Sequence, residues 1–310
     1  MSNHFNIKKY LKTDEYIYNE GIYDFLNNEK HYSDSFAFEY EKFSKIQFDS
    51  FNNSNLTKDR FINSTNWSKT ELEDKDLLEV GSGNGRFTEI LLDYKSNLIT
   101  FDSSDAIFQN YKHNISKITK NKNFFIKADI YNLPFIEEKF DYIFCCGVLQ
   151  NTQNPLKTLE VLIPYLKKNG KMVLDITKKN NFYFLNPKYF WRNFTVKLNK
   201  EILFKIVNFY VRKFYNIDAY LKNRFGFFGR ILSRILLPLP LISSEQLNLS
   251  QELKIDFSVL DTFDCLASTY DNPLSKRNIQ IFLNKLLKKG IIKLGKIIEN
   301  QNLFIIHIDK

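Results

Sequence analysis

The sequence predicts an α/β fold in which helices cover both faces of a mostly parallel, seven-stranded sheet. Three observations support this prediction. Short apolar runs alternate with helical patterns from residue 76 to about residue 176. A glycine-rich turn, Gly81 to Gly85, joins the first apolar run to a helical pattern. The last two apolar runs are four residues apart, which allows an antiparallel hairpin but no parallel crossover.

Each expected element has its own local signal. The expected strands are residues 77–80, 97–101, 123–127, 140–146, 171–176, 291–298 and 303–308. Helical spacing is found at residues 86–94, about 104–118, 154–166 and 277–288. Pro155 suits the first turn of its helix, and Gly290 suits the position just after the last one.

Composition limits the class of protein. The chain of 310 residues has 44 Lys and Arg against 35 Asp and Glu, so its formal net charge is +9. These cations are dispersed, and a solvated basic surface explains them without a nucleic-acid partner. The three cysteines have neither disulfide nor zinc spacing, so we expect no metal and a reducing cytoplasm. No apolar run approaches the roughly 20 residues that a membrane-spanning helix needs.

The segment from Leu77 to Arg86 carries the clearest chemical signal. Its glycines allow a sharp turn and a close approach to a ligand, and the following helix offers free amide groups. A dinucleotide fingerprint would need glycine where Arg86 stands; here the third glycine, Gly85, comes one residue early. Glu79 also lies within the strand, which suits a cationic ligand better than a pyrophosphate. A nicotinamide dehydrogenase is therefore disfavoured.

Three further positions follow the later strands in order. Asp102 ends the second strand, 21 residues after Gly81, where an acid can accept both hydroxyls of a ribose. Asp129 follows the third strand and can accept a hydrogen bond from an adenine amino group. Gly147 follows the fourth strand, where the chain must pass close to the ligand. Capping a helix or a turn is the alternative role for both aspartates.

Together these residues resemble the class I S-adenosylmethionine-dependent methyltransferases. The resemblance covers about residues 70–178 and the last 35 or so. It implies S-adenosylmethionine as the cofactor and a core of Rossmann-like type. The cofactor-site candidates that it implies are Glu79, Gly81, Ser82, Gly83, Asp102, Ser103, Asp129, Ile130 and Gly147.

The domain organisation follows from this resemblance. We expect an N-terminal extension or lid (1–65), a cofactor-binding core (66–178), a helical aromatic and basic insertion (179–255) and a C-terminal completion of the sheet (256–310). Residues 21–50 resemble the lead-in of bacterial methyltransferases of lipid, quinone or cell-surface glycan pathways. A small-molecule acceptor is therefore expected, and no nucleic acid.

The catalytic residues are harder to predict. Methyl transfer needs positioning above all, and a base only when the acceptor arrives protonated. The four histidines do not cluster near the motifs; His31 could lie in the N-terminal lid. The candidates are Gln150 and Asn151 after the fourth strand, and Tyr270 and Asp271 before the last helix.

The insertion is the expected source of acceptor specificity. Ile202, Ile206, Tyr210 and Phe214 share a helical face. Such a face usually packs on its own domain. The alternative is a peripheral contact of residues 200–240 with an anionic lipid surface at the inner membrane face. The sequence does not determine the oligomeric state.

Two other functions stay open. An RNA methyltransferase is the enzymatic alternative, since the chain is basic, although the Asn/Asp-Pro-Pro-aromatic motif of base-amino enzymes is absent after the fourth strand. Cytosine-C5 enzymes need a Pro-Cys nucleophile, which the sequence lacks. A non-catalytic binding module on the same fold is the second alternative.

Overall fold

A computed structural model of the chain describes residues 7–26, 38, 42–43, 45–179, 186–237, 239–242, 244, 247–300 and 302–310. The chain divides into two compact units. Unit 1 comprises Met1–Ala37, Leu56–Asn180 and Tyr270–Lys310. Unit 2 comprises Phe38–Asn55 and Asn181–Thr269.

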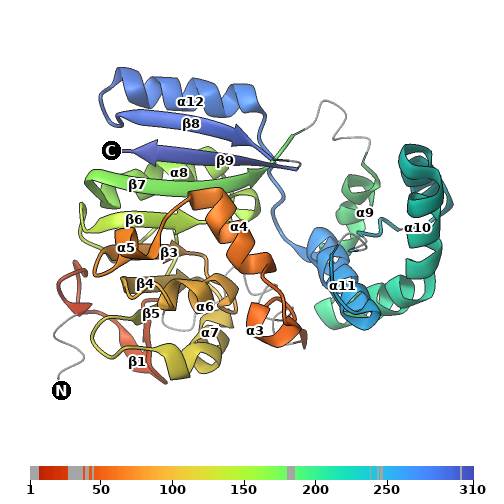
Figure 1. Ribbon diagram of the computed structural model, residues 1–310, viewed down its shortest axis with the longest axis horizontal. Helices are drawn as coiled ribbons and strands as arrows, with labels where there is room; N and C mark the ends of the chain where they lie inside the picture. The colour runs from red at the N-terminus through yellow and green to blue at the C-terminus, as the bar shows by residue number, and fades with distance from the viewer. Residues whose placement is uncertain are drawn as a thin grey trace. The chain divides into compact units, whose positions relative to one another are not determined.

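Unit 1 is built on one mixed sheet with the strand order β1-β2-β5-β4-β3-β6-β7-β9-β8 (Figure 1). Its strands are β1 (Ile17–Asn19), β2 (Ile22–Asp24), β3 (Asp76–Val80), β4 (Asn97–Asp102), β5 (Phe124–Lys127), β6 (Phe140–Cys145), β7 (Leu166–Thr177), β8 (Leu294–Glu299) and β9 (Leu303–Asp309). The six strands from β2 to β7 pair in parallel with one another, in the order β2-β5-β4-β3-β6-β7. At the two ends of the sheet, β1 is antiparallel to β2, and β9 is antiparallel to both β7 and β8. The expected α/β sheet with an antiparallel C-terminal hairpin is confirmed.

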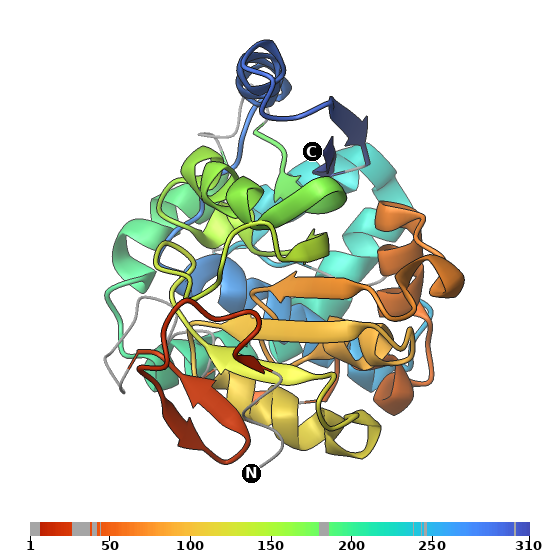
Figure 2. The ribbon, with the colours of Figure 1, turned by 90° about the vertical axis from the view of Figure 1, so that its left-hand side faces the viewer.

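The expected number of seven strands is wrong, because the described sheet has nine. The seven expected strands are β3 to β9. The N-terminal segment adds β1 and β2, and β2 pairs in parallel with β5. Figure 2 shows this hairpin beside β5. Each added strand has three residues, too few to show a period of two, so the sequence pattern could not reveal them.

Helices cover both faces of the sheet. Leu78 and Val80 of β3 point into a core shared with α8 and α12, and Leu77 points into a core shared with α4 to α6. Figure 1 shows α4, α6 and α7 in front of the sheet and α8 behind it. The bounds are α4 (Leu56–Thr65), α5 (Lys69–Leu72), α6 (Arg86–Leu92), α7 (Ala106–Asn114), α8 (Pro155–Leu162) and α12 (Lys276–Lys288), with short 3-10 turns η1 (Ile115–Lys117), η2 (Leu149–Asn151) and η3 (Ile163–Tyr165).

Local signals place the helix starts. The Asn154 side chain accepts a 3.1 Å hydrogen bond from the Lys157 amide, and Pro155 occupies the first turn of α8. The Ser275 hydroxyl accepts one of 3.2 Å from the Asn278 amide at the start of α12. Both side chains occupy amide groups that the first helical turn leaves without partners.

Unit 2 is helical where it is described, and it contains α3 (Asp49–Asn52), α9 (Pro187–Thr195), α10 (Lys200–Leu236) and α11 (Gln251–Ala267). Gly226 (φ 51°, ψ −118°) interrupts α10. The chain then folds back, since the Ser233 hydroxyl donates to the buried Asp218 carboxylate. A Cβ on Gly229 would lie 1.9 Å from the Leu221 carbonyl oxygen, so the two halves of α10 approach too closely for a side chain there.

The apolar face expected at the start of α10 is only in part available. Tyr210 is buried with residues of α11, whereas Ile202 and Ile206 stay 54% and 44% exposed. Helix α11 belongs to unit 2, and the last segment of unit 1 begins at Tyr270. None of the described helices is long and apolar enough to span a bilayer.

Candidate functional site

The sheet topology places the candidate site at the carboxyl ends of its parallel strands. Strand β3 lies between β4 and β6, so the strand order reverses there: β4 and β5 lie on one side of β3, and β6 and β7 on the other. In open α/β sheets, ligands bind beyond the carboxyl ends at this switch point. Gly81 follows β3, Asp102 ends β4 and Gly147 lies two residues after β6. The fold therefore gathers at one edge the motifs that the sequence singles out.

The glycine turn after β3 is tightly constrained. Gly81 has a φ of +66°, and its amide donates a 2.9 Å hydrogen bond to the Phe101 carbonyl. A Cβ on Gly81 would lie 2.5 Å from a methyl carbon of Val148. Both the backbone conformation and the close approach therefore require glycine at this position.

Asp102 ties the end of β4 to this turn. Its Oδ2 accepts a 2.8 Å hydrogen bond from the Gly83 amide. Its Oδ1 accepts from the Ser104 amide at 2.8 Å and from the Ser104 hydroxyl at 2.7 Å. A carboxylate has about four acceptor positions, so these three bonds leave room for a ligand hydroxyl. Asp102 thus shapes the turn as well as being available to a ribose.

Glu79 is buried and faces α6. Its Oε2 accepts a 2.6 Å hydrogen bond from the Thr88 hydroxyl, and the side chain is 2% exposed. Burial raises the pKa of Glu79 to about 7, against the opposing effect of the hydroxyl hydrogen bonds. Asn110 extends the network, since its Nδ2 donates to the Thr88 hydroxyl at 2.8 Å. Sequence reasoning missed Asn110, which no motif marks.

The remaining cofactor candidates differ in their surroundings. Ser82 is buried, and within the described part of the chain its hydroxyl has no hydrogen-bond partner. Asp129 accepts a 3.0 Å hydrogen bond from the Tyr131 amide, which makes a local turn. Ile130 is buried, and Ser103 and Asp129 are half-buried. An orphaned buried hydroxyl costs free energy unless a ligand satisfies it, so Ser82 fits a ligand site.

Asp175 and Arg60 join the site although no sequence motif marked them. Asp175, near the end of β7, is 1% exposed. Its Oδ1 accepts a 2.6 Å hydrogen bond from the Gly147 amide. Its Oδ2 lies 2.5 Å from the Arg60 guanidinium, which comes from α4. An acid inside a strand that is otherwise apolar was the available signal.

Two arginines flank Gly147. Gly147 has a φ of +80°. A Cβ at this position would lie 3.6 Å from a guanidinium nitrogen of Arg86 and 4.0 Å from one of Arg60. Both guanidinium groups also lie over the Phe87 ring, at 5.0 Å and 5.6 Å from its centroid. The chain after β6 thus passes two guanidinium groups, of which that of Arg60 is paired with Asp175.

The structure brings the catalytic candidates into one neighbourhood through Asn272. Gln150 and Asn151 form η2, and the Asn272 amide donates a 2.8 Å hydrogen bond to the Gln150 carbonyl. The Asn272 side chain donates to the Thr152 carbonyl at 2.8 Å. Tyr270 lies two residues before this link. Within the described residues, the Gln150 Oε1 atom is buried and accepts no hydrogen bond.

Cys145 and Cys146 are buried, and two of the four histidines lie outside the described residues. Burial raises the pKa values of the Cys145 and Cys146 thiols well above the ordinary range, which disfavours the nucleophilic thiolates. His4 and His31 lie outside the described residues. Among the residues that are described, no cluster of His, Cys, Asp and Glu could hold a metal ion.

The comparisons with known proteins agree with this geometry. Residues 78–174 match the family described as "Methyltransferase domain". The chain is 33% identical over 104 residues to the tRNA U34 carboxymethyltransferase of Nautilia profundicola, covering 34% of this chain and 35% of that protein. It is 32% identical over 139 residues to the same-named protein of Helicobacter pylori, covering 43% and 51%. The chain thus spans about half or less of the length of these relatives.

Solved structures of methyltransferases also resemble the chain. Magnesium protoporphyrin IX methyltransferase from Synechocystis PCC 6803 aligns with this chain at 11% identity and a TM-score of 0.48. The alignment covers 90% of this chain and 96% of that protein. A methyltransferase from Aquifex aeolicus covers 91% at 12% identity, with 99% of its own length and a TM-score of 0.44.

One sequence expectation needs correction. We expected no nucleic acid among the partners, and this is contradicted because the curated relatives are named as tRNA enzymes. The expected enzyme class and cofactor are confirmed at the level of the matched domain. Residues 78–174 match a methyltransferase domain, and the methyl donor is S-adenosylmethionine.

Proposed function

We propose that the chain is an S-adenosylmethionine-dependent transferase that modifies a tRNA. One observation carries the catalytic part: the Gly81 turn, Asp102 and Gly147 lie at the carboxyl ends of three adjacent parallel strands. The acceptor part rests on the names of the curated relatives. A tRNA acceptor is also compatible with a cytoplasmic location and with the net charge of +9.

We assign the cofactor contacts by the type of group each residue offers. The turn from Glu79 to Gly83 would hold the methionine part, Asp102 and Ser103 the ribose, and Asp129 with Ile130 the adenine. The Ser82 hydroxyl and the free acceptor positions of Asp102 are groups that a polar ligand would satisfy. Gly147 lets the chain pass close to the reacting carbon.

The bound cofactor supplies an electrophilic methyl carbon on a sulfonium sulfur. The chain's own residues then align the acceptor with that carbon, which is the main requirement of an in-line displacement. The buried Gln150 Oε1 is free to accept a hydrogen bond from the acceptor. Asn151 and Tyr270 are the other groups that we assign to orienting the acceptor or receiving its proton. The Asn272 link holds η2 in place for this task.

A second candidate reaction is carboxymethyl transfer, for which the curated relatives are named. It needs as co-reactant a sulfonium donor that carries a carboxymethyl group in place of the methyl group of S-adenosylmethionine. A carboxymethyl group carries a carboxylate, and Arg60 and Arg86 both lie close to Gly147. Arginine matches a carboxylate in charge and in planar geometry. The transferred group is identified by the mass that the product gains.

The experiment combines binding and turnover. Calorimetry with S-adenosylhomocysteine on the wild type and Asp102→Ala tests the cofactor site; we expect one-site binding that the substitution abolishes. Incubation of the protein with labelled S-adenosylmethionine and unmodified tRNA tests the acceptor, with a tRNA carrying cytidine at position 34 as the control. Label that depends on the uridine supports the proposal. Label on a lipid, quinone or sugar but on no tRNA overturns it, and absence of binding favours a non-catalytic module.

Tyr270 is tested separately. We expect Tyr270→Phe to lose most of the turnover and to keep the affinity for S-adenosylhomocysteine, since the ring stays and only the hydroxyl is lost. Unchanged turnover would remove Tyr270 from the site and leave Gln150 as the residue to test next.

A further inference from the structure

Helix α12 has one apolar side and one strongly basic side. Ile279, Leu283 and Leu286 are buried in the core of unit 1. Lys285, Lys288 and Lys289 are exposed, and the last two follow Lys285 by three and four residues, which places each of them next to Lys285 at the helix end. We call these three lysines the α12 basic face.

The charge around this face is of one sign. Residues 272–298 contain seven Lys and Arg and no Asp or Glu, in a chain with 35 acidic residues in total. The cations continue beyond the helix end as Lys293 and Lys296. A helix dipole favours cations in the last turn, which accounts for Lys285 and Lys288 but not for the other cations of the stretch.

The three lysines also lack neutralising partners. Lys276, at the start of α12, pairs with Glu299 at 2.7 Å, and Lys293 donates to the Asn169 side chain at 2.6 Å. The ammonium groups of the α12 basic face make no ion pair or hydrogen bond to any other described residue. Their charge is therefore available to an external anion.

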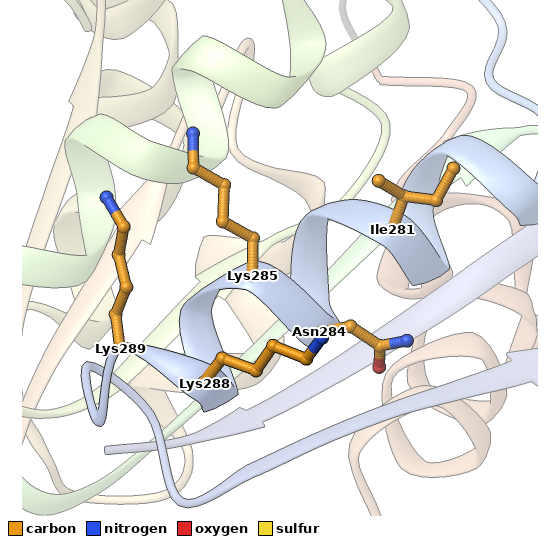
Figure 3. A pocket seen from close by; sticks show the side chains of 5 residues that line it. All are labelled: Ile281, Asn284, Lys285, Lys288 and Lys289. Carbon is orange, nitrogen blue, oxygen red and sulfur yellow. The ribbon is translucent and has the colours of Figure 1, made fainter.

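The surface at this place is hollowed. A shallow hollow of about 430 Å³ is bordered by Ile281, Asn284 and the three lysines (Figure 3). Figure 3 shows Lys285 and Lys289 extending side by side from the helix. Several cations on an open surface can contact successive negative charges of a polyanion, and they need no deep pocket for a single anion.

We propose that the α12 basic face binds the phosphate backbone of the tRNA, away from the modified nucleotide; this inference rests on the proposed function. Unpaired lysines of one sign are the usual means of holding a nucleic-acid backbone. A bilayer fits less well, because an interfacial helix inserts its apolar side and that of α12 is already buried in the core.

The test compares two triple variants of the full chain. The first is Lys285→Ala, Lys288→Ala and Lys289→Ala. The readout is tRNA affinity by fluorescence anisotropy at several salt concentrations, with S-adenosylhomocysteine binding as the check that the fold is intact. We expect about tenfold weaker tRNA binding and a log–log salt slope smaller by about 2 to 3.

The control removes the same charge elsewhere in unit 1. Lys8, Lys95 and Lys112 are exposed and paired with Asp14, Glu73 and Glu20. Their replacement by alanine should leave tRNA affinity and salt slope almost unchanged.

The outcomes separate the two proposals. If the wild type modifies tRNA and the two triple variants bind tRNA equally well, the proposed role of the α12 basic face is refuted and the proposed function stands. If the wild type modifies no tRNA but binds it through these lysines, only the proposed function fails. Absence of tRNA binding, or binding of anionic vesicles through the same lysines in its place, overturns the face as an RNA surface.

Discussion

The Asp175 carboxylate lies 2.6 Å from the Gly147 amide nitrogen and joins the ends of β7 and β6. The same carboxylate holds Arg60 of α4. One buried acid therefore holds both the Gly147 backbone and the Arg60 guanidinium, at the residue that we propose to lie close to the reacting carbon.

We expect Asp175→Ala to lower the free energy of unfolding by about 2 kcal/mol, because it leaves a half-buried amide and a half-buried guanidinium without their acceptor. The affinity for S-adenosylhomocysteine should fall about tenfold, since Gly147 loses its support. Asp175→Asn keeps an oxygen for the amide and should be milder in both respects. Urea unfolding and calorimetry give the two quantities. Equal effects of the two variants would show that the Gly147 contact contributes nothing.

Gly81→Ala should be poorly tolerated for two separable reasons. The positive φ costs about 1 kcal/mol, and the clash with Val148 adds to it. Gly290→Ala is the matched control, because Gly290 also has a positive φ (+65°) but no atom within 4 Å of its Cβ position. The double variant Gly81→Ala, Val148→Ala should recover part of the loss after allowing for Val148→Ala alone. Denaturation midpoints of the four variants decide this, and an absence of coupling would refute the clash.

Glu79 predicts an unusual dependence of stability on pH. Its folded pKa of about 7 lies above its ordinary value of 4.5, so the folded state binds the proton more tightly than the unfolded state. Protonated Glu79 therefore adds about 3 kcal/mol to the free energy of unfolding below pH 4.5, relative to high pH. This contribution is lost as the pH rises through 7. Glu79→Gln should abolish that slope. Urea unfolding at pH 5 and pH 8 measures it, and the same pH dependence in wild type and variant would contradict it.

Gly229→Ala should destabilise unit 2, by about 2 kcal/mol, because the added methyl would meet the Leu221 carbonyl oxygen at 1.9 Å. The two halves of α10 must then separate, and the hydrogen bond from Ser233 to Asp218 should weaken. Hydrogen exchange of the α10 amides reports this locally. Exchange rates that match the wild type in α10 would show that the helix hairpin can absorb the methyl group.

Much of the fold could be predicted because its strands are apolar and well separated. The runs 77–80, 97–101 and 140–146 correspond to β3, β4 and β6 within one or two residues. The hairpin β1–β2 could not be predicted, because three-residue strands show no period and their pairing partner β5 is about 100 residues away.

The site was predictable where a motif carries it. Glycines with positive φ and acids at strand ends leave a signal in the sequence, and Gly81 and Asp102 were found in this way. Arg60 and Asp175 are 115 residues apart and meet only in the folded chain, so their pairing has no sequence signal.

Because β2 pairs with β5, it can join the sheet only after β5 has been synthesised. Ile22, Tyr23 and Asp24 emerge from the ribosome early, but their partners Phe125, Ile126 and Lys127 are translated about 100 residues later. The hairpin must therefore remain outside the sheet until about half of the matched domain, residues 78–174, has been made. Until the hairpin docks, β5 has an unpaired edge that could pair with a neighbouring nascent chain.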